Sequence, residues 1–238
     1  MRLDNQEIYN FLFEQGVRSL HHANTLATSL TFIQNGGLLS RGAVEDRGLF
    51  QTRQQSDNED KMYGVWHDIF FDSKDLHGHF PRQNLYGPIL FKFNLQVILS
   101  PDLDISITKN NPMFWNAETR DTDKYFLNMK DVRENWDRYD LQRKMITLRF
   151  QKNILPFDHL ENIIVDDPNV TIYEDTILHN ESLNALNNEI NKNKNLIGKV
   201  SVRTCTRCYC QSNYLRDYGA LKLAKAFLPN SHPRFSNS

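Results

Sequence analysis

The sequence predicts a mixed fold of the α+β type, and three segments carry that prediction. Residues 89–99 place an apolar side chain at every second position, which is the period of a half-buried strand. Residues 4–16 and 212–228 instead space their apolar side chains at helical intervals, ending at a glycine and before a proline. Helices at both ends of the chain are therefore expected to pack on a central sheet.

Size and charge set the broad class. A chain of 238 residues with 39% apolar and 24% charged residues is long enough for one large domain. We expect that domain over residues 1–203, followed by a basic helical extension with a disordered tail over residues 204–238. The net charge of −1 argues against a protein that coats nucleic acid by bulk electrostatics. Without a long apolar run or an apolar leader, the expectation is a cytoplasmic protein with no membrane partner.

A histidine pair opens the most informative stretch. His21 and His22 precede Asn24 and Thr25, either of which can cap a helix that the glycines at 36–37 would end. The pair is therefore expected just ahead of a helix N-terminus, where backbone N–H groups favour anionic or hydroxyl-rich ligands.

Three arginines follow in a polar segment, at positions 41, 47 and 53. A guanidinium fork matches a diphosphate better than any other side chain. A strand over residues 64–71 is then expected to carry His67 and Asp68, with a loop over residues 73–86 bordering the same ligand.

The rest of the chain supplies shorter elements. The patterns predict strands within residues 103–108, 144–150, 163–165, 170–173 and 196–202, and a helix over residues 181–193. The charged and aromatic segment 113–143 is either an insertion that contacts substrate or a surface subdomain packed by its own rings.

The C-terminal region is basic and contains tyrosines. It contains one acidic residue, Asp217, and seven basic residues, which are Lys199, Arg203, Arg207, Arg216, Lys222, Lys225 and Arg234. With Tyr209, Tyr214 and Tyr218 between them, they suit phosphate contact and base stacking, or else form a solvated helix face with core tyrosines.

The cysteines cluster within six residues, as Cys205, Cys208 and Cys210. An odd number so close together is no disulfide framework, and indicates a reducing compartment. The first two have metal-ligand spacing but would need a fourth ligand such as His232, so we expect no metal here.

The motifs of the first half occur in an order that resembles the DarT family, toxins that transfer ADP-ribose from NAD onto nucleobases. The resemblance also extends to CmdT, a relative from phage-defence toxin–antitoxin–chaperone systems that acts on messenger RNA. It covers residues 19–110, weakens to residue 165 and then ends. The residues that carry it are His21/His22…Gly36-Gly37-Leu38-Leu39…Arg53…Gly64-Val65-x-His67-Asp68-x-x-Phe71.

The resemblance implies a split β-sheet around an NAD cleft, flanked by helices, with NAD as a substrate. Arg53 would clamp the diphosphate, and His22, with His21 as the alternative register, would hold the nicotinamide-side ribose. Arg53 and His22 are thereby candidate catalytic residues.

Further NAD contacts are implied at four positions. Asn24 stands where the family usually has a hydroxyl residue, which is a departure from its pattern. His67, Asp68 and Phe71 match the strand that follows and would be structural or pocket-lining residues.

The catalytic acid is missing from its expected place. The family's glutamate precedes a Leu/Phe-Pro turn, here Leu155-Pro156, and its position falls near Thr147 in a strand without a carboxylate. Either the register differs, or the chain is catalytically silenced, or Thr147 is replaced by an acid from elsewhere. The candidate acids are Asp140, Glu134 and Asp158, and Asp140 and Thr147 are the candidate catalytic residues of this part of the chain.

These observations favour a toxin-like mono-ADP-ribosyltransferase acting on RNA or single-stranded DNA and restrained by an antitoxin. A catalytically inactive module that binds NAD or nucleic acid is the alternative. A third hypothesis is a partner-binding module of a toxin–antitoxin complex that uses segment 113–143 as its contact surface.

Overall fold

A computed structural model of the chain describes residues 3–77, 79–80, 82–140, 143–204 and 209–235. The helices are α1 (Asn5–Glu14), α2 (Leu26–Gln34), α3 (Arg41–Asp46), α4 (Asp57–Met62), α5 (Asp121–Lys124), α6 (Met129–Asn135), α7 (Leu178–Ile190), α8 (Cys210–Asp217) and α9 (Ala220–Phe227). The strands are β1 (Ser19–Asn24), β2 (Gly37–Leu38), β3 (Ile69–Asp72), β4 (Ile89–Asn94), β5 (Ile105–Ile107), β6 (Met145–Leu148), β7 (Leu155–Pro156), β8 (Leu160–Asp167), β9 (Thr171–Ile172), β10 (Thr176–Ile177) and β11 (Val200–Thr204).

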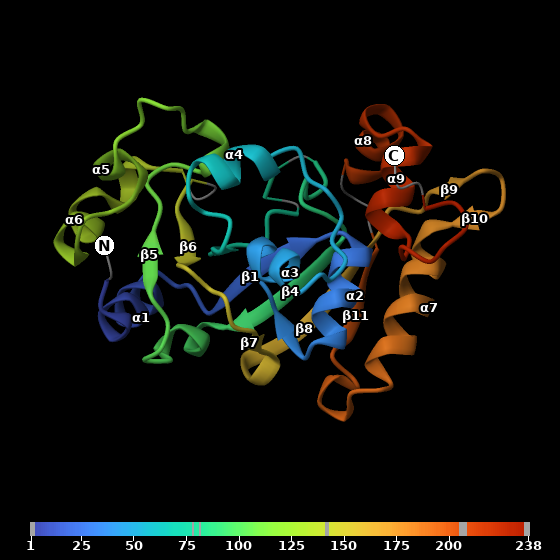
Figure 1. Ribbon diagram of the computed structural model, residues 1–238, viewed down its shortest axis with the longest axis horizontal. Helices are drawn as coiled ribbons and strands as arrows, with labels where there is room; N and C mark the ends of the chain where they lie inside the picture. The colour runs from blue at the N-terminus through green and yellow to red at the C-terminus, as the bar shows by residue number, and fades with distance from the viewer. Residues whose placement is uncertain (1–2, 78, 81, 141–142, 205–208, 236–238) are drawn as a thin grey trace.

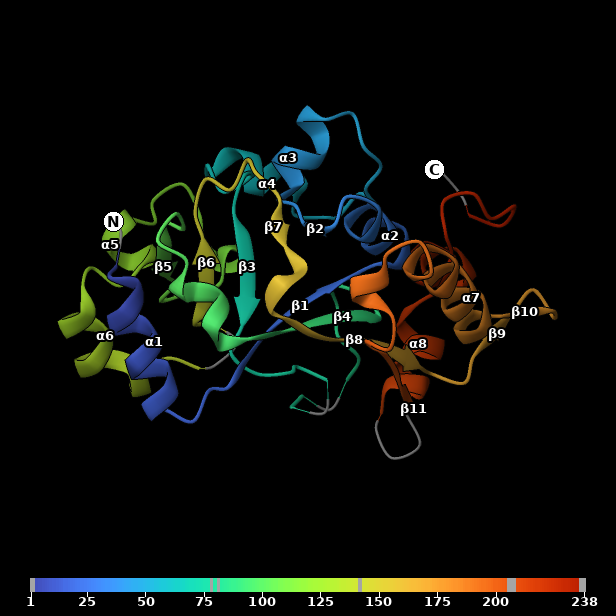
Figure 2. The same ribbon diagram turned by 90° about the horizontal axis from the view of Figure 1, so that it is seen from below.

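Seven strands form the main sheet in the order β11-β8-β4-β1-β3-β6-β5. All neighbours are antiparallel except β8 and β11. β1 pairs with β4 from Ser19 to Asn24, but it pairs with β3 only where His21 faces Asp72. The sheet therefore opens between β1 and β3, and Figure 2 shows β3 and β6 running across the direction of β1, β4 and β8. The predicted α+β fold with a split sheet is confirmed.

Most helices lie near the two ends of this sheet, and α3 and α4 lie between these two groups (Figure 1). α1 packs against α6 beyond β5, while α2, α7 and α9 pack on one another near β8. The main core includes Phe32 of α2, Phe91 of β4 and Leu186 of α7, all with at most 2% of their surface exposed. Within the described residues, every helix is too short or too polar to cross a bilayer.

The histidine pair lies in a strand that leads directly into a helix. His21 and His22 belong to β1, and the following helix α2 begins at Leu26. Thr25 is its N-cap by backbone geometry, but its hydroxyl bonds to other threonines instead of the helix N–H groups. The helix ends as predicted, with Gly36 in the left-handed region at φ +76°.

Three predicted elements end or begin elsewhere. The strand expected over residues 64–71 begins only at Ile69, so His67 and Asp68 precede it. The long strand of residues 89–99 stops at Asn94, whose side chain accepts a hydrogen bond from the Gln96 N–H and starts a 3₁₀ turn. The final helix is interrupted at positions 218–219, which separates α8 from α9.

The C-terminal helices share a second hydrophobic cluster with the main domain. Tyr214 of α8 and Phe227 of α9 are buried in it together with Ala27 of α2 and Leu178 of α7. Phe235, at the end predicted to be disordered, packs against Phe50 with ring centroids 5.8 Å apart. The described part of residues 204–238 is thus in direct contact with the main domain.

The aromatic segment 113–143 packs largely on its own rings. Trp115 lies edge-on to Tyr125 and Tyr63, and Phe126 lies between Trp136 and Tyr139. The segment is not packed by its own rings alone, because Phe126 and Trp136 also belong to the main core. Its first residues reach the cleft described below.

Candidate active site

A cleft of about 880 Å³ lies where the sheet opens. Its walls come from β1, the connection over residues 51–56, the loop before β4 and the helices α8 and α9. Loop 73–86 contributes as predicted, through Leu76 and residues 82–86, and segment 113–143 contributes Met113 and Trp115. Ligand sites in proteins typically occupy such a volume, and it is large enough for a dinucleotide.

His22 lines this cleft and has a buried ring nitrogen without a partner among the described residues. Its Nδ1 lies 2.9 Å from the Phe70 carbonyl oxygen, which can only accept, so Nδ1 carries the proton. Burial lowers the pKa of His22 and keeps the ring neutral. Nε2 is then a lone-pair acceptor, and it is buried without a partner among the described residues. Such a nitrogen suits a ligand hydroxyl.

His21 and Asn24 flank His22 on β1 and also line the cleft. The Nδ1 of His21 approaches the Asp72 carbonyl oxygen at 3.4 Å, and burial lowers the pKa of this ring as well. The side-chain oxygen of Asn24 accepts a hydrogen bond from the Thr25 N–H at 2.9 Å.

At Gly87 the chain before β4 passes close to the backbone of Asn24 in β1, a contact that the sequence analysis did not identify. A Cβ on Gly87 would lie 2.2 Å from the backbone of Asn24, and its φ of +147° is one that other residues rarely adopt. The lone glycine before Pro88 was the only signal for this contact.

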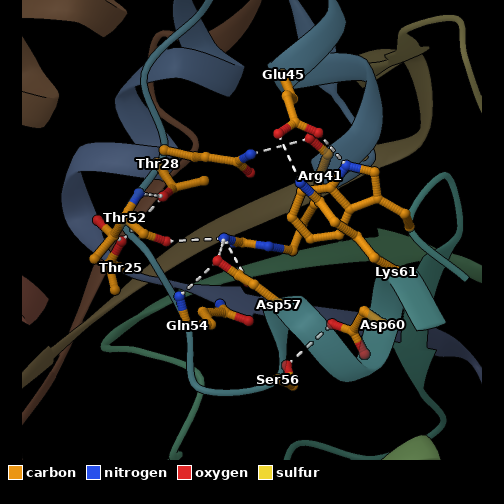
Figure 3. Close-up of polar contacts among 12 residues, drawn as sticks. Thr25, Thr28, Arg41, Glu45, Thr52, Gln54, Ser56, Asp57, Asp60 and Lys61 are labelled. Carbon is orange, nitrogen blue, oxygen red and sulfur yellow. Dashed lines mark hydrogen bonds and ion pairs between the residues drawn. The ribbon is translucent and has the colours of Figure 1, made fainter. Parts of the chain in front are cut away.

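Arg41 and Arg53 bring positive charge to the rim. Arg41 donates through Nη2 to the carboxylate of Asp57 at 2.9 Å and to the Thr52 carbonyl at 3.1 Å (Figure 3). Its Nε and Nη1 have no hydrogen-bond partner among the described residues. Arg53 is exposed, lines the cleft and makes no hydrogen bond or ion pair with the described chain. Together they offer unused guanidinium donors to an anion.

A threonine cluster holds the segment that carries Arg53. The Thr25 hydroxyl lies within hydrogen-bond distance of the hydroxyls of Thr28 and Thr52, at 3.2 and 2.8 Å, and the Thr52 N–H donates to the Thr28 hydroxyl at 2.9 Å (Figure 3). The backbone next to Arg53 is thereby tied to the first turn of α2.

Asp68 and Asp72, the carboxylates at the two ends of β3, have different surroundings. Asp68 lies 2.8 Å from the Arg149 guanidinium and accepts the Phe150 N–H at 2.9 Å. Asp72 is only 6% exposed, and its Oδ1 has no donor among the described residues. Burial, followed by the nearby charge of Asp75, raises the pKa of Asp72 to about 7. The sequence analysis did not select Asp72.

Several predicted site residues lie away from the cleft surface. His67 packs against Gly42 and sits 3.8 Å from Asp46. Phe71 is fully buried against Phe93 in the core. Thr147 is fully buried in β6, where its hydroxyl donates to the Met145 carbonyl at 3.3 Å.

The three acids considered as replacements are not part of the cleft lining either. Asp140 and Glu134 have 85% and 60% of their side chains exposed and face Arg143 and Lys130. Asp158 is exposed in the turn after β7. None of them is brought near His22 by the fold.

An ionic network fixes the loop after β3. Arg203 of β11 binds Asp166 at 2.7 Å and also contacts Asp75, while His77 lies 3.1 Å from Asp166. Although burial lowers it, hydrogen bonds from His77 to Asp166 and Cys210 raise the pKa of His77 to about 10. The loop is thus held against β8 by a charged histidine and an arginine.

The basic C-terminus contributes to the cleft through α8 and α9. Tyr218, Lys222 and Lys225 line it, and the Lys222 ammonium lies 5.9 Å from the centre of the Tyr218 ring. This placement agrees with the phosphate-contact interpretation of the basic region.

No metal site is formed by the residues that the structure describes, since no three His, Cys, Asp or Glu side chains gather in a suitable group. Cys210 is buried beside His77, whereas Cys205 and Cys208 lie outside the described residues.

Comparisons with known proteins give structural neighbours only. No protein-family model matches the chain, and no curated protein sequence is similar to it. Two solved structures of DarT from Thermus sp. 2.9 are similar in fold, one in complex with ADP-ribosylated ssDNA and one in complex with NAD+. They share 13% and 12% identity with this chain, with TM-scores of 0.48 and 0.47, and cover 79% of it and 95% and 96% of their own length. A likeness at that level assigns neither an activity nor a substrate to this chain.

Proposed function

We propose that the protein is an NAD-dependent mono-ADP-ribosyltransferase that modifies a base of RNA or single-stranded DNA. The observation that carries this proposal is the set of unpartnered polar atoms on one cleft. His22, Arg41, Gln51, Asp72 and Gln83 each contribute at least one buried atom without a hydrogen-bond partner among the described residues. Buried polar atoms are normally paired, so their convergence favours a polar ligand that completes them.

The charges suit NAD in particular. Arg53 is exposed on the cleft, and Arg41, paired with Asp57, has two buried guanidinium nitrogens without a partner among the described residues. A diphosphate would receive charge-assisted hydrogen bonds from these groups. The neutral Nε2 of His22 would accept a hydrogen bond from a ribose hydroxyl deeper in the cleft. Phe70, Trp66 and Tyr218 add ring surfaces for the nicotinamide and the bases.

The second substrate is a nucleic acid for reasons of charge and accessibility. Lys222 and Lys225 place two cationic side chains of α9 on the cleft, where they could contact a backbone phosphate. A base modified on its pairing edge has to be unpaired, which favours single strands or loops. A role as a cytoplasmic toxin in anti-phage defence, restrained by an antitoxin, is the biological setting that we propose for this activity.

The test is incubation of the purified protein with isotope-labelled NAD and separate pools of RNA, single-stranded DNA and protein. Label in one nucleic-acid pool, released as ADP-ribosylated nucleoside on digestion, supports the proposal and identifies the polymer. Intact NAD and unlabelled pools would contradict it.

One observation favours a second candidate. The position expected to hold the catalytic glutamate is Thr147, fully buried and without access to the cleft. A catalytically inactive module that binds NAD or nucleic acid would retain the cleft without turnover. Calorimetric binding of NAD with no labelled product would identify this alternative.

A further inference from the structure

Asp72 is the cleft carboxylate that the fold leaves least engaged. It is the last residue of β3, paired with His21 of β1 and with Met145 of β6, and all three residues line the cleft. Only 6% of its surface is exposed, and its Oδ1 is buried without a donor from the described residues. A buried carboxyl normally has hydrogen-bond or charge partners, so the lack of a donor at Oδ1 of Asp72 requires an explanation.

The other acids of the cleft are engaged or open to solvent. Asp68 is bound by Arg149 and Phe150, Asp60 accepts a hydrogen bond from Ser56 at 3.0 Å, and Asp217 is paired with Arg216 at 2.6 Å. Glu59 is exposed. Asp68 also has a buried oxygen without a hydrogen-bond partner, but that oxygen lies 2.8 Å from the Arg149 guanidinium. Asp72 differs from these acids because it is buried, its Oδ1 has no donor, and it forms no ion pair among the described residues.

The register explains how Asp72 can stand in for the absent glutamate of β6. Thr147 faces Phe70 across the β3–β6 ladder, and Asp72 lies two residues beyond Phe70 on the same face of β3. Met145, the cross-strand partner of Asp72, reaches the cleft from β6. The carboxylate is therefore supplied by the neighbouring strand, next to the place where the sheet opens.

We propose that Asp72 is the catalytic carboxylate of this cleft and takes the proton from the attacking nitrogen of the nucleic-acid base. This inference rests on the proposed function. The bond between ribose C1′ and the nicotinamide nitrogen breaks, and its electron pair leaves with neutral nicotinamide. A bond forms between C1′ and the base nitrogen, whose proton passes to the Asp72 carboxylate and then to water.

The surroundings of Asp72 suit a group that both accepts and releases a proton. The charged or titratable groups that face it are His21 from β1, Asp75 from the following loop and Tyr86 from the loop before β4. β6 presents Met145, which carries no charge. Without a cationic partner to hold it ionised, the carboxylate is a stronger base than a solvated one.

The experiment compares Asp72→Asn with wild type and with Asp102→Asn, which removes an exposed carboxylate away from the cleft. Asparagine keeps the shape of the side chain and removes its ability to accept a proton. We expect Asp72→Asn to lower the single-turnover rate of transfer from labelled NAD by at least about 100-fold, within the usual range for general-base removal. NAD affinity by calorimetry and the thermal midpoint should not fall, and Asp102→Asn should match wild type.

The pH profile separates a proton acceptor from a structural residue. The wild-type rate should rise with pH and level off above about 7, where Asp72 is ionised, whereas the residual rate of Asp72→Asn should not follow this rise. If Asp72→Asn transfers ADP-ribose at the wild-type rate, the inference about Asp72 is wrong, and the proposed function is not affected. A folded, NAD-binding wild type that labels no pool overturns both.

Discussion

Asp68 and Asp72 lie at the two ends of β3 and are equally buried, but their carboxylates have different bonding partners. Asp68, just before the strand, is neutralised by Arg149 and capped by the Phe150 N–H. Asp72, at its last position, lines the cleft and has a buried oxygen without a donor among the described residues. Burial raises the pKa of both carboxyls, but only at Asp68 does a guanidinium oppose this rise.

The difference shows which carboxylate holds the fold together. Phe150 has a positive φ of 54°, and the hydrogen bond from its N–H to Asp68 fixes the backbone in this uncommon conformation. Asp68 therefore joins the start of β3 to the end of β6. Asp72 makes no comparable link, so its burial weakens the folded state unless a ligand uses the group.

Replacing Asp68 should produce the largest loss of stability. Asp68→Asn leaves the Arg149 guanidinium, whose side chain is 13% exposed, without its counter-charge. Breaking a buried pair from one side costs about 3 to 5 kcal/mol of unfolding free energy. Urea denaturation at pH 7 measures it, with Asp72→Asn as the matched variant on the same strand.

The matched variant should change stability in the opposite direction. Asp72→Asn removes an unpaired buried charge and should unfold at the same or a higher urea concentration than wild type. Equal destabilisation by both substitutions would show that the two carboxylates have the same structural role.

The pH dependence of stability should sharpen the comparison further. Asp72 has a pKa of about 7 in the folded state, against an ordinary aspartate pKa of 3.8, so between these values the folded state binds more protons than the unfolded state. Its contribution therefore destabilises progressively as pH rises from 4 to 7 and is absent below pH 4. At about 1.4 kcal/mol per pKa unit, the full effect is about 4 to 5 kcal/mol.

This contribution is isolated by a difference between two proteins. The gain in unfolding free energy of Asp72→Asn over wild type should be near zero at pH 4 and largest above pH 7, with other groups cancelling. A gain that is constant with pH would mean that Asp72 does not titrate in this range.

The sequence predicted well where the local pattern matches the local structure. The helix from Asp4, the left-handed end of α2 at Gly36 and the short strand within residues 103–108 are all present. The split sheet was also predicted, but on the family resemblance rather than on periodicity. The places where a strand or helix stops early depend on side-chain contacts, which the hydrophobic pattern of the sequence does not contain. One example is the hydrogen bond from the Gln96 N–H to the Asn94 side chain, which ends β4.

The candidate site was harder to predict for a physical reason. Whether a carboxylate is used by the fold depends on its neighbours across strands, and these come from positions far away in the chain. Asp68 was selected beside a motif histidine, yet its partner Arg149 lies 81 positions later. Asp72 has no motif, and only the meeting of β1, β3 and β6 shows that its oxygen is unfilled.

The same contrast, between a charged group paired within the fold and one left unpaired, exists between Arg149 and Arg53. Of the substitutions discussed, the one at Arg53 has the smallest expected effect. Arg149 is occupied by Asp68, whereas Arg53 makes no ion pair or hydrogen bond with the described residues and reaches the cleft. Arg53→Ala should therefore leave the thermal midpoint unchanged and lower NAD affinity by about 10- to 100-fold, the value of one charge-assisted hydrogen bond or two. Isothermal titration with NAD measures the change.

The control for this prediction is Arg120→Ala, which removes an equal charge from an exposed ion pair with Asp123 outside the cleft. If both substitutions weaken NAD binding equally, the effect comes from net charge and not from the position of Arg53. If only Arg53→Ala does, repeating the titration with ADP-ribose and with adenosine locates the contact. A loss that persists with ADP-ribose but disappears with adenosine places the guanidinium on the diphosphate, since adenosine lacks that group.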